Sequence, residues 1–194
     1  MKVISHKDLP IYSFKTPDEF HQWLSKNHTR EMAFWLRYYK KNSGKQTILP
    51  SQAVDEALCW GWIDGLVNKY DDESWLVRFT PRRPKSVWSK VNVSKVERLV
   101  SEKRMQPCGQ KHVDTAKADG RWEAAYAGQA AITVPDEFIS LVKTDKLAWE
   151  FYQSLSKANK YAIAFRIATT VDKDKKRQKM QKIFEMLQSK KSFH

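Results

Sequence analysis

The segment ALCWGWIDGLVNKYDDESWLVRFT, residues 57–80, decides the fold, because it holds two strand patterns joined by a short acidic turn. We expect IDGLVNKY and SWLVRFT to pair as a hairpin through DDES, since acidic residues are common in turns. If Tyr70 pairs with Trp75, the side chains of the hairpin divide between a core face and an opposite face. Asp64 then lies at the end of the core face, and Arg78 lies on the opposite face. The predicted core face then consists of Leu66, Tyr70, Trp75, Val77 and Phe79.

One strand and two helices are predicted before this hairpin. The stretch TPDEFHQWL begins a helix with Thr16 as N-cap and Pro17 in the first turn. The aromatic stretch MAFWLRYYKK, residues 32–41, reads as a strand that ends at the turn NSGK. Pro50 opens a second helix, and Gly61 is its expected end.

After residue 90 the apolar residues recur at helical spacing. Helices are expected at residues 92–105 and 109–122, and a helical unit follows with helices at residues 134–156, 157–170 and 172–188. The last helix carries an apolar stripe of Met180, Ile183, Phe184 and Leu187. The whole pattern predicts an α+β fold, in which a small antiparallel sheet with flanking helices is followed by a helical C-terminal unit. We expect domains at residues 1–130 and 131–194.

The positive charge of the chain is unevenly distributed. The net charge is +13, and residues 78–104 contain nine Lys or Arg against two acidic residues, while residues 171–194 contain eight against three. A concentrated positive patch attracts anions, whether a small anionic molecule, an acidic protein surface or a nucleic acid. The tail charges are expected to form the solvated face of an amphipathic helix.

The segment RFTPRRPKSVWSKVN, residues 78–92, is the predicted ligand-binding segment. Guanidinium groups bind phosphate or carboxylate through two hydrogen bonds, prolines restrict the loop, and an indole offers a stacking face. The alternative is a solvated basic loop in which Trp88 enters the core and Ser89 or Asn92 caps the next helix. The candidate ligand-binding residues are Arg78, Arg82, Arg83, Trp88, Ser89 and Asn92, together with Asp64.

Asp64 has two interpretations. A carboxylate between Trp62 and the hairpin is costly to bury unless an arginine meets it, so it forms either a buried Asp–Arg clamp or part of a functional site. In the second case it would orient a guanidinium toward an anionic ligand or act as a general base. Cys59 is expected to be a small buried hydrophobe. Cys108, near several cations, is expected to have mild reactivity.

The sequence contains none of the motifs that hold a metal or a nucleotide cofactor. The five histidines show no HxH, HxxxH or HExxH spacing, and neither GxxxxGK[ST] nor GxGxxG occurs. The two cysteines form no CxxC pair, and the start MKVISHKDLP lacks the features of a signal peptide. We therefore expect no metal, no cofactor, no membrane insertion and a cytoplasmic location.

Several motifs together resemble a known family. They are TPDEFHQWL, KKNSGK, ALCWGWIDG, RFTPRRPKSVWSKVN, the M-x-P-x-G stretch at residues 105–109 and the basic C-terminal helix. The combination is similar to the YdeI/OmpD-associated, or bacteriocin-protection, family. The resemblance implies a bacterial cytoplasmic protein with an OmdA-like C-terminal unit, in a context of stress or bacteriocin protection.

Three functions remain open at this level. The first is binding of an anionic ligand at an Arg/Trp pocket, without a cofactor. The second is an enzyme that acts on a small phosphorylated or carboxylated substrate through Asp64 or Cys108. The third is weak binding of single-stranded nucleic acid, which Arg and Trp side chains would support although no RNP, helix-turn-helix or zinc-finger signature occurs.

Overall fold

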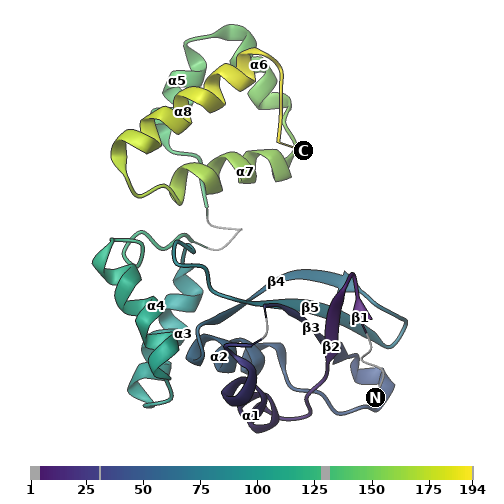
Figure 1. Cartoon of the computed structure of the whole chain (residues 1–194). Helices are drawn as coiled ribbons and strands as arrows, with labels where there is room; N and C mark the ends of the chain where they lie inside the picture. Colours follow the sequence, from purple (N-terminus) through teal and green to yellow (C-terminus); the bar gives the residue numbers. More distant parts are fainter. Residues whose placement is uncertain (1–4, 31, 128–131, 194) are drawn as a thin grey trace. The chain divides into compact units, whose positions relative to one another are not determined.

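The computed structural model describes residues 5–30, 32–127 and 132–193, which form two compact units (Figure 1). The first unit contains the chain up to residue 86 together with residues 94–115, and the second contains residues 87–93 and the chain from residue 116 onward. The predicted domain boundary near residue 130 falls outside the described residues. The division into domains 1–130 and 131–194 therefore stays a prediction.

The first unit is built on a five-stranded mixed sheet with the strand order β1-β2-β3-β5-β4. Strands β2 and β3 pair in parallel, and the other neighbours pair antiparallel. The α+β class is confirmed, although the sheet is not wholly antiparallel because of the N-terminal strands, which the sequence did not predict. The strands are β1 (Ser5–His6), β2 (Leu9–Tyr12), β3 (Phe34–Tyr39), β4 (Trp62–Lys69) and β5 (Ser74–Pro81).

The β4–β5 hairpin forms as predicted, but its register differs by one residue. Trp75 pairs with Lys69 rather than Tyr70, and a bulge lies between Asp64 and Val67. The bulge adds one residue to β4, which the pattern of alternating side chains alone does not reveal. In the observed register Val67 rather than Leu66 lies opposite Val77, and the predicted core position Leu66 is 63% exposed.

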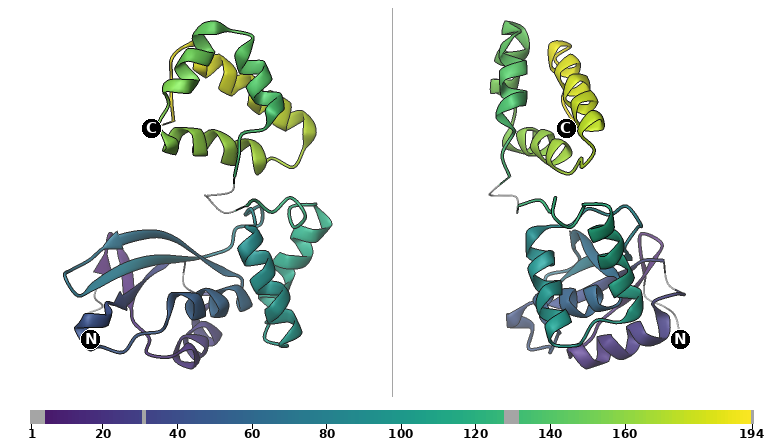
Figure 2. Two further views of the ribbon diagram at one scale, coloured as in Figure 1. Left: turned by 180° about the vertical axis from the view of Figure 1, so that it is seen from behind. Right: turned by 90° about the vertical axis from the view of Figure 1, so that its left-hand side faces the viewer.

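Helices α1 (Pro17–Asn27) and α2 (Pro50–Cys59) cover one face of the sheet (Figures 1 and 2). Thr16 caps α1 as predicted, because its Oγ1 accepts a hydrogen bond of 3.2 Å from the amide of Glu19. A short 3₁₀ helix (Lys41–Ser43) follows β3. The core between the helices and the sheet is rich in aromatic side chains and contains Phe14, Phe20, Leu24, Phe34, Leu36, Tyr38, Ile48, Ala53, Ala57, Trp62, Val77 and Phe79.

The chain then forms a helical hairpin of α3 (Lys90–Ser101) and α4 (Pro107–Ala118). The first turn of α4 lies against the end of α2, where Gln106 N donates to the carbonyl oxygen of Cys59 over 3.1 Å. A Cβ atom on Gly109 would lie only 2.1 Å from that same oxygen. Gly61, which follows α2 with a φ of +73°, is also close to α4, since a Cβ there would lie 2.8 Å from the ring of His112.

The second unit contains four C-terminal helices: α5 (Asp136–Lys143), α6 (Lys146–Ser154), α7 (Lys157–Ala168) and α8 (Lys173–Gln188). The single helix predicted at residues 134–156 is two helices, because Asp145 accepts a hydrogen bond of 2.9 Å from Ala148 N and starts a new helix. The predicted stripe on α8 is confirmed. Its members Met180, Ile183, Phe184 and Leu187 are all buried.

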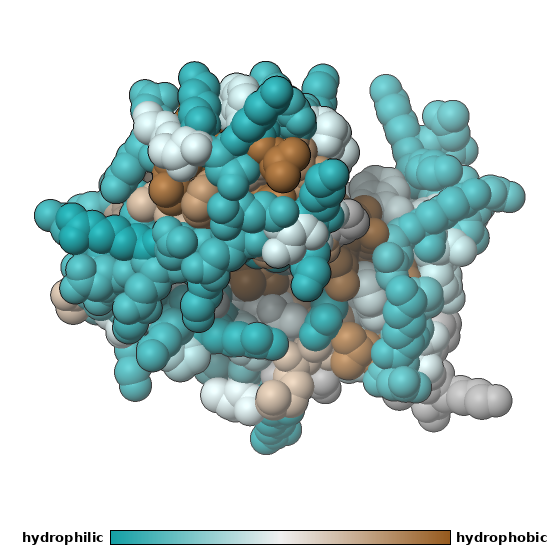
Figure 3. Space-filling model, turned by 90° about the horizontal axis from the view of Figure 1, so that it is seen from above, coloured by the Kyte–Doolittle hydropathy of each residue, from teal (hydrophilic) through white to brown (hydrophobic). Residues whose placement is uncertain are grey.

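Charged and polar side chains cover most of the face of the molecule seen in Figure 3, and the hydrophobic patches on it are small. Within the described ranges, no helix has both the length and the apolar composition needed to cross a membrane.

We predict that Gly109→Ala lowers the free energy of unfolding by roughly 1–3 kcal/mol, because the added methyl group overpacks the contact with Cys59. The matched control is Gly65→Ala, whose Cβ would meet its nearest atom, the carbonyl oxygen of Arg78, at 3.7 Å. Thermal and urea unfolding of both variants measures the difference. Equal stabilities would show that the α2–α4 contact tolerates a side chain.

Candidate functional site

Two of the predicted ligand-binding residues, Arg78 and Arg83, line one cavity of about 220 Å³ in the first unit. Arg78 alternates along β5 with the core residues Val77 and Phe79, so it lies on the sheet face that α1 and α2 do not cover. Arg83 follows the end of the strand. The cavity is lined by Ile63, Gly65, Leu66, Arg78, Thr80, Pro81, Arg83 and Ser86.

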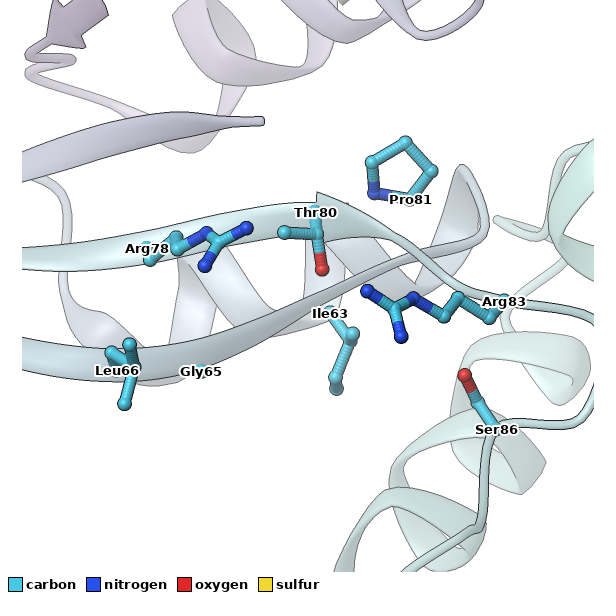
Figure 4. A pocket seen from close by; sticks show the side chains of 8 residues that line it. All are labelled: Ile63, Gly65, Leu66, Arg78, Thr80, Pro81, Arg83 and Ser86. Carbon is cyan, nitrogen blue, oxygen red and sulfur yellow. The ribbon is translucent and has the colours of Figure 1, made fainter. Parts of the chain in front are cut away.

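The guanidinium groups of Arg78 and Arg83 point toward one another, with Thr80 between them (Figure 4). Thr80 is two residues from Arg78 on β5 and therefore projects from the same face. A turn in which Ser86 N donates to Arg83 O over 2.9 Å brings Ser86 next to Arg83, and its hydroxyl points toward the guanidinium. The sequence did not single out Thr80.

The charges of this cavity are not neutralised by carboxylates in the described part of the chain. No acidic residue lines the cavity, and neither Arg78 nor Arg83 makes an ion pair there. The Nε atom of Arg78 is also buried without a hydrogen-bond partner among those residues. Two converging cations with an unsatisfied donor favour the binding of an anion, because a buried donor without a partner costs about 1–3 kcal/mol.

Three other arginines of the first unit, Arg37, Arg98 and Arg104, show the contrast. Arg37 pairs with Asp71 at 2.6 Å, and Arg98 pairs with Asp55 at 2.6 Å. Arg104 pairs with Glu56 and Glu102. Pairing with a carboxylate is therefore common in this unit, and its absence at Arg78 and Arg83 distinguishes the cavity.

Arg82, which was predicted to bind the ligand with Arg83, does not line the cavity. Its backbone amide donates to Gly61 O over 2.8 Å, and its side chain is only 5% exposed. Desolvation raises the pKa of the nearby Asp64 carboxyl group, and the positive charge of Arg82 offsets a small part of that increase. The two adjacent arginines are thus in different environments.

Asp64 is exposed, and the prediction of a buried Asp–Arg clamp is wrong. The residue lies opposite Phe79 in the hairpin, and its charge helps to raise the pKa of the buried Tyr38 hydroxyl, although burial of that hydroxyl is the larger cause. Partial desolvation raises the pKa of Asp64 itself, and the charges of Lys95 and Arg82 only partly offset the increase. Asp64 does not line the arginine cavity.

The alternative reading of the segment around Trp88 is the one that the structure shows. Trp88 is 2% exposed and packs edge-to-face against Trp122, with ring centres 4.9 Å apart, so the predicted stacking face for a ligand is wrong. Ser89 Oγ accepts a hydrogen bond of 3.2 Å from the amide of Asn92, which caps α3. These residues belong to the second unit.

Neither cysteine is activated. Burial, with a smaller contribution from the charge of Glu56, raises the pKa of the Cys59 thiol to about 12. This agrees with the prediction of a buried hydrophobe, since Cys59 is almost fully enclosed. Desolvation also raises the pKa of the Cys108 thiol. The prediction that nearby cations would make this thiol mildly reactive is therefore wrong.

The described residues contain no group of three or more His, Cys, Asp or Glu side chains that could hold a metal ion. They do contain an ionic cluster that sequence reasoning missed, formed by the buried Glu56 with His21 and Arg104. The sequence contains one signal for this cluster. Glu56 follows Ala53 by three residues in α2, so both residues lie on the buried face of that helix.

The fold and the cavity define a two-unit α+β protein with a basic pocket on its sheet. The chain belongs to the family described as a domain of unknown function (DUF8412), whose model matches residues 12–112, about half of its length. Residues 131–190 match the model for OmdA, "Bacteriocin-protection, YdeI or OmpD-Associated". The resemblance predicted from the sequence is thus confirmed for the C-terminal part, whereas ALCWGWIDG lies in the other match. No curated protein and no solved structure matches the chain.

We predict that Asp64→Asn increases stability at pH 7. The raised pKa means that the folded state holds this proton more tightly than the unfolded state, so folding is weakened as the pH rises above about 3.9, the ordinary pKa of Asp. An asparagine does not ionise, so the advantage of the variant should disappear as the pH falls below that range. Urea unfolding at pH 7 and pH 4 tests the sign. A large loss of stability in Asp64→Asn at pH 7 would instead support the interpretation of Asp64 as an Asp–Arg clamp.

Proposed function

We propose that the first unit binds a small anionic molecule between Arg78 and Arg83. The observation that carries this proposal is the convergence of two guanidinium groups on one cavity without a carboxylate in its lining. Mutual repulsion and incomplete solvation of the two cations are relieved when an anion accepts their hydrogen bonds. The binding energy would come mainly from these charge-assisted contacts.

The lining also limits the kind of anion. A guanidinium matches the geometry of a phosphate or carboxylate group, and the hydroxyl of Thr80 can donate to a further oxygen atom. Ile63, Leu66 and Pro81 add apolar surface at the same cavity. Its volume of about 220 Å³ lies below the roughly 300–1,000 Å³ of pockets for drug-sized ligands. These features favour a phosphate or carboxylate that carries a small apolar group.

The arrangement favours binding over the other functions that the sequence left open. Neither Asp64 nor Cys108 lines the cavity, so neither is placed to react with an anion held by the arginines. Trp88 is buried, which removes the stacking platform expected for single-stranded nucleic acid. An acidic protein surface is less suited than a small molecule to so small a cavity.

The biological setting is proposed from the family description of the C-terminal part. Bacteriocin protection or a related stress response in a bacterial cytoplasm would be the context in which the anion is bound. The basic face of α8 supplies positive charge in the second unit as well.

We predict that Arg83→Gln weakens the binding of phenyl phosphate about 10- to 100-fold, because a hydrogen bond to a charged group contributes about 1.5–3 kcal/mol. Arg83 is exposed, so the fold should be retained. The matched control is Lys85→Gln, which removes the same charge from an exposed position of the same loop that does not line the cavity. Isothermal titration calorimetry at low salt, with inorganic phosphate as a second probe, measures the affinities.

Two results would contradict the proposal. One is the absence of saturable binding of either probe to the unaltered protein. The other is an equal loss in both variants, because that would mean that only the overall charge attracts the anion.

A further inference from the structure

A second cavity of about 440 Å³ lies elsewhere in the first unit and shares no lining residue with the arginine cavity. It is formed by the first two turns of α1, the buried side of α2 and the connection between α3 and α4. Its lining consists of Pro17, Asp18, His21, Glu56, Arg104 and Gln106.

Glu56 is the fixed point of this cavity. It is only 5% exposed, and each of its carboxylate oxygens has a partner. Oε1 accepts a hydrogen bond from Arg104 Nη2, and Oε2 lies 2.9 Å from His21 Nδ1. A carboxylate held by a guanidinium acts as an acceptor, so the proton of the second hydrogen bond belongs to His21.

This contact decides which nitrogen of His21 is free. The indole Nε1 of Trp60 is also near Nδ1, at 3.4 Å, but Nδ1 cannot accept a hydrogen bond from it while donating to Glu56. The shorter bond to a charged acceptor is the stronger of the two. In the neutral ring Nδ1 is therefore protonated, and Nε2 carries the lone pair.

The cavity contains two acceptors, His21 Nε2 and the Asp18 carboxylate, beside the guanidinium of Arg104. Among the described residues His21 Nε2 has no hydrogen-bond partner, and the His21 side chain is 41% exposed. The amide nitrogen of Gln106 donates one hydrogen bond, of 3.1 Å, to Arg104 O. Asp18 contributes an exposed carboxylate, and Arg104 is already shared between Glu56 and Glu102.

We propose that this cavity is a second ligand site, which binds a small molecule carrying an ammonium group, with His21 Nε2 and the Asp18 carboxylate as its acceptors. Glu56 and Arg104 are positioning residues, since they fix the ring and its protonated nitrogen. The two acceptors that would bind the ligand contrast with the guanidinium groups of the arginine cavity, which are donors. The two sites would select opposite charges from the same solution.

The tautomer of His21 is tested first. Two-dimensional ¹H–¹⁵N spectra of the histidine side chains, recorded above the titration of the ring, are expected to show a protonated Nδ1 and an unprotonated Nε2 for His21. His28 provides the internal comparison, because its ring also lies against Trp60 but does not line the cavity. A neutral ring protonated at Nε2 would overturn the proposal, since the acceptor would be absent.

Binding is tested with ethanolamine as the probe, followed at the His21 ring nitrogens and by calorimetry. A saturable shift is expected at Nε2, and Asp18→Asn should weaken binding about fivefold, as for a partly exposed charge pair. Measured by calorimetry, His21→Gln should abolish ethanolamine binding, whereas His28→Gln should leave the affinity unchanged. Asp18 is exposed and His21 is partly so, and both variants are expected to fold.

Three outcomes would overturn the second site: no saturable binding of ethanolamine, equal weakening by His28→Gln, or displacement of ethanolamine by phosphate in the Arg83→Gln protein. The proposed anion site is tested separately, because His21→Gln should not change the affinity for phenyl phosphate. Conversely, Arg83→Gln should not change the affinity for ethanolamine.

Discussion

The contact between Gly109 and the carbonyl group of Cys59 is the constraint on which the first unit depends. There is no space for a side chain at this point, so the backbone of α4 meets the backbone at the end of α2 directly. Such a contact allows little movement between the two segments, because tightly packed atoms have no alternative arrangement of similar energy. The position of the connection between α3 and α4 is thereby fixed relative to α2.

The cavity around His21 follows from this contact, and the arginine cavity depends on a second backbone contact just after α2. The fixed connection brings Arg104 and Gln106 over the buried Glu56, which completes the cavity around His21. The same end of α2 leads through Gly61 into β4, and the carbonyl oxygen of Gly61 accepts the hydrogen bond from Arg82 N. That bond holds the start of the loop that carries Arg83. One backbone contact, at Gly109, thus positions the charged side chains of the His21 cavity, and the other, at Gly61, positions those of the arginine cavity.

The sequence was sufficient for the local features. Thr16 could be recognised as an N-cap and the stripe on α8 as buried, because both depend on residues within one or two helical turns. The hairpin was also recognisable from its alternating pattern, but its register and the bulge beside Asp64 were not, and Leu66 is exposed instead of lying in the predicted core. Strands β1 and β2 were missed because they are short, and because β2 joins the sheet by pairing with β3, which is distant along the chain.

The candidate sites show the same limit. The sequence grouped Arg78 and Arg83 with Trp88 because they are close along the chain, yet Trp88 is buried against Trp122 in the second unit. Glu56, His21 and Arg104 come from three separate elements, and only the tertiary fold brings them together. The one local sign of this cluster was the carboxylate of Glu56 on the buried face of a helix. A buried carboxylate requires a cation as its partner, and that cation comes from elsewhere in the chain.

The two clusters differ in how their charges are balanced, and this difference separates the roles of their members. Glu56 is neutralised inside the protein, so removing Arg104 would leave a buried charge without its partner, and the pair is needed for the fold itself. Arg78 and Arg83 have no such internal partner among the described residues, so their convergence weakens the folded state until an anion is bound. A protein that keeps an unfavourable pair of cations on a rigid sheet gains nothing in stability from it, which is the pattern expected where a charge is retained for binding.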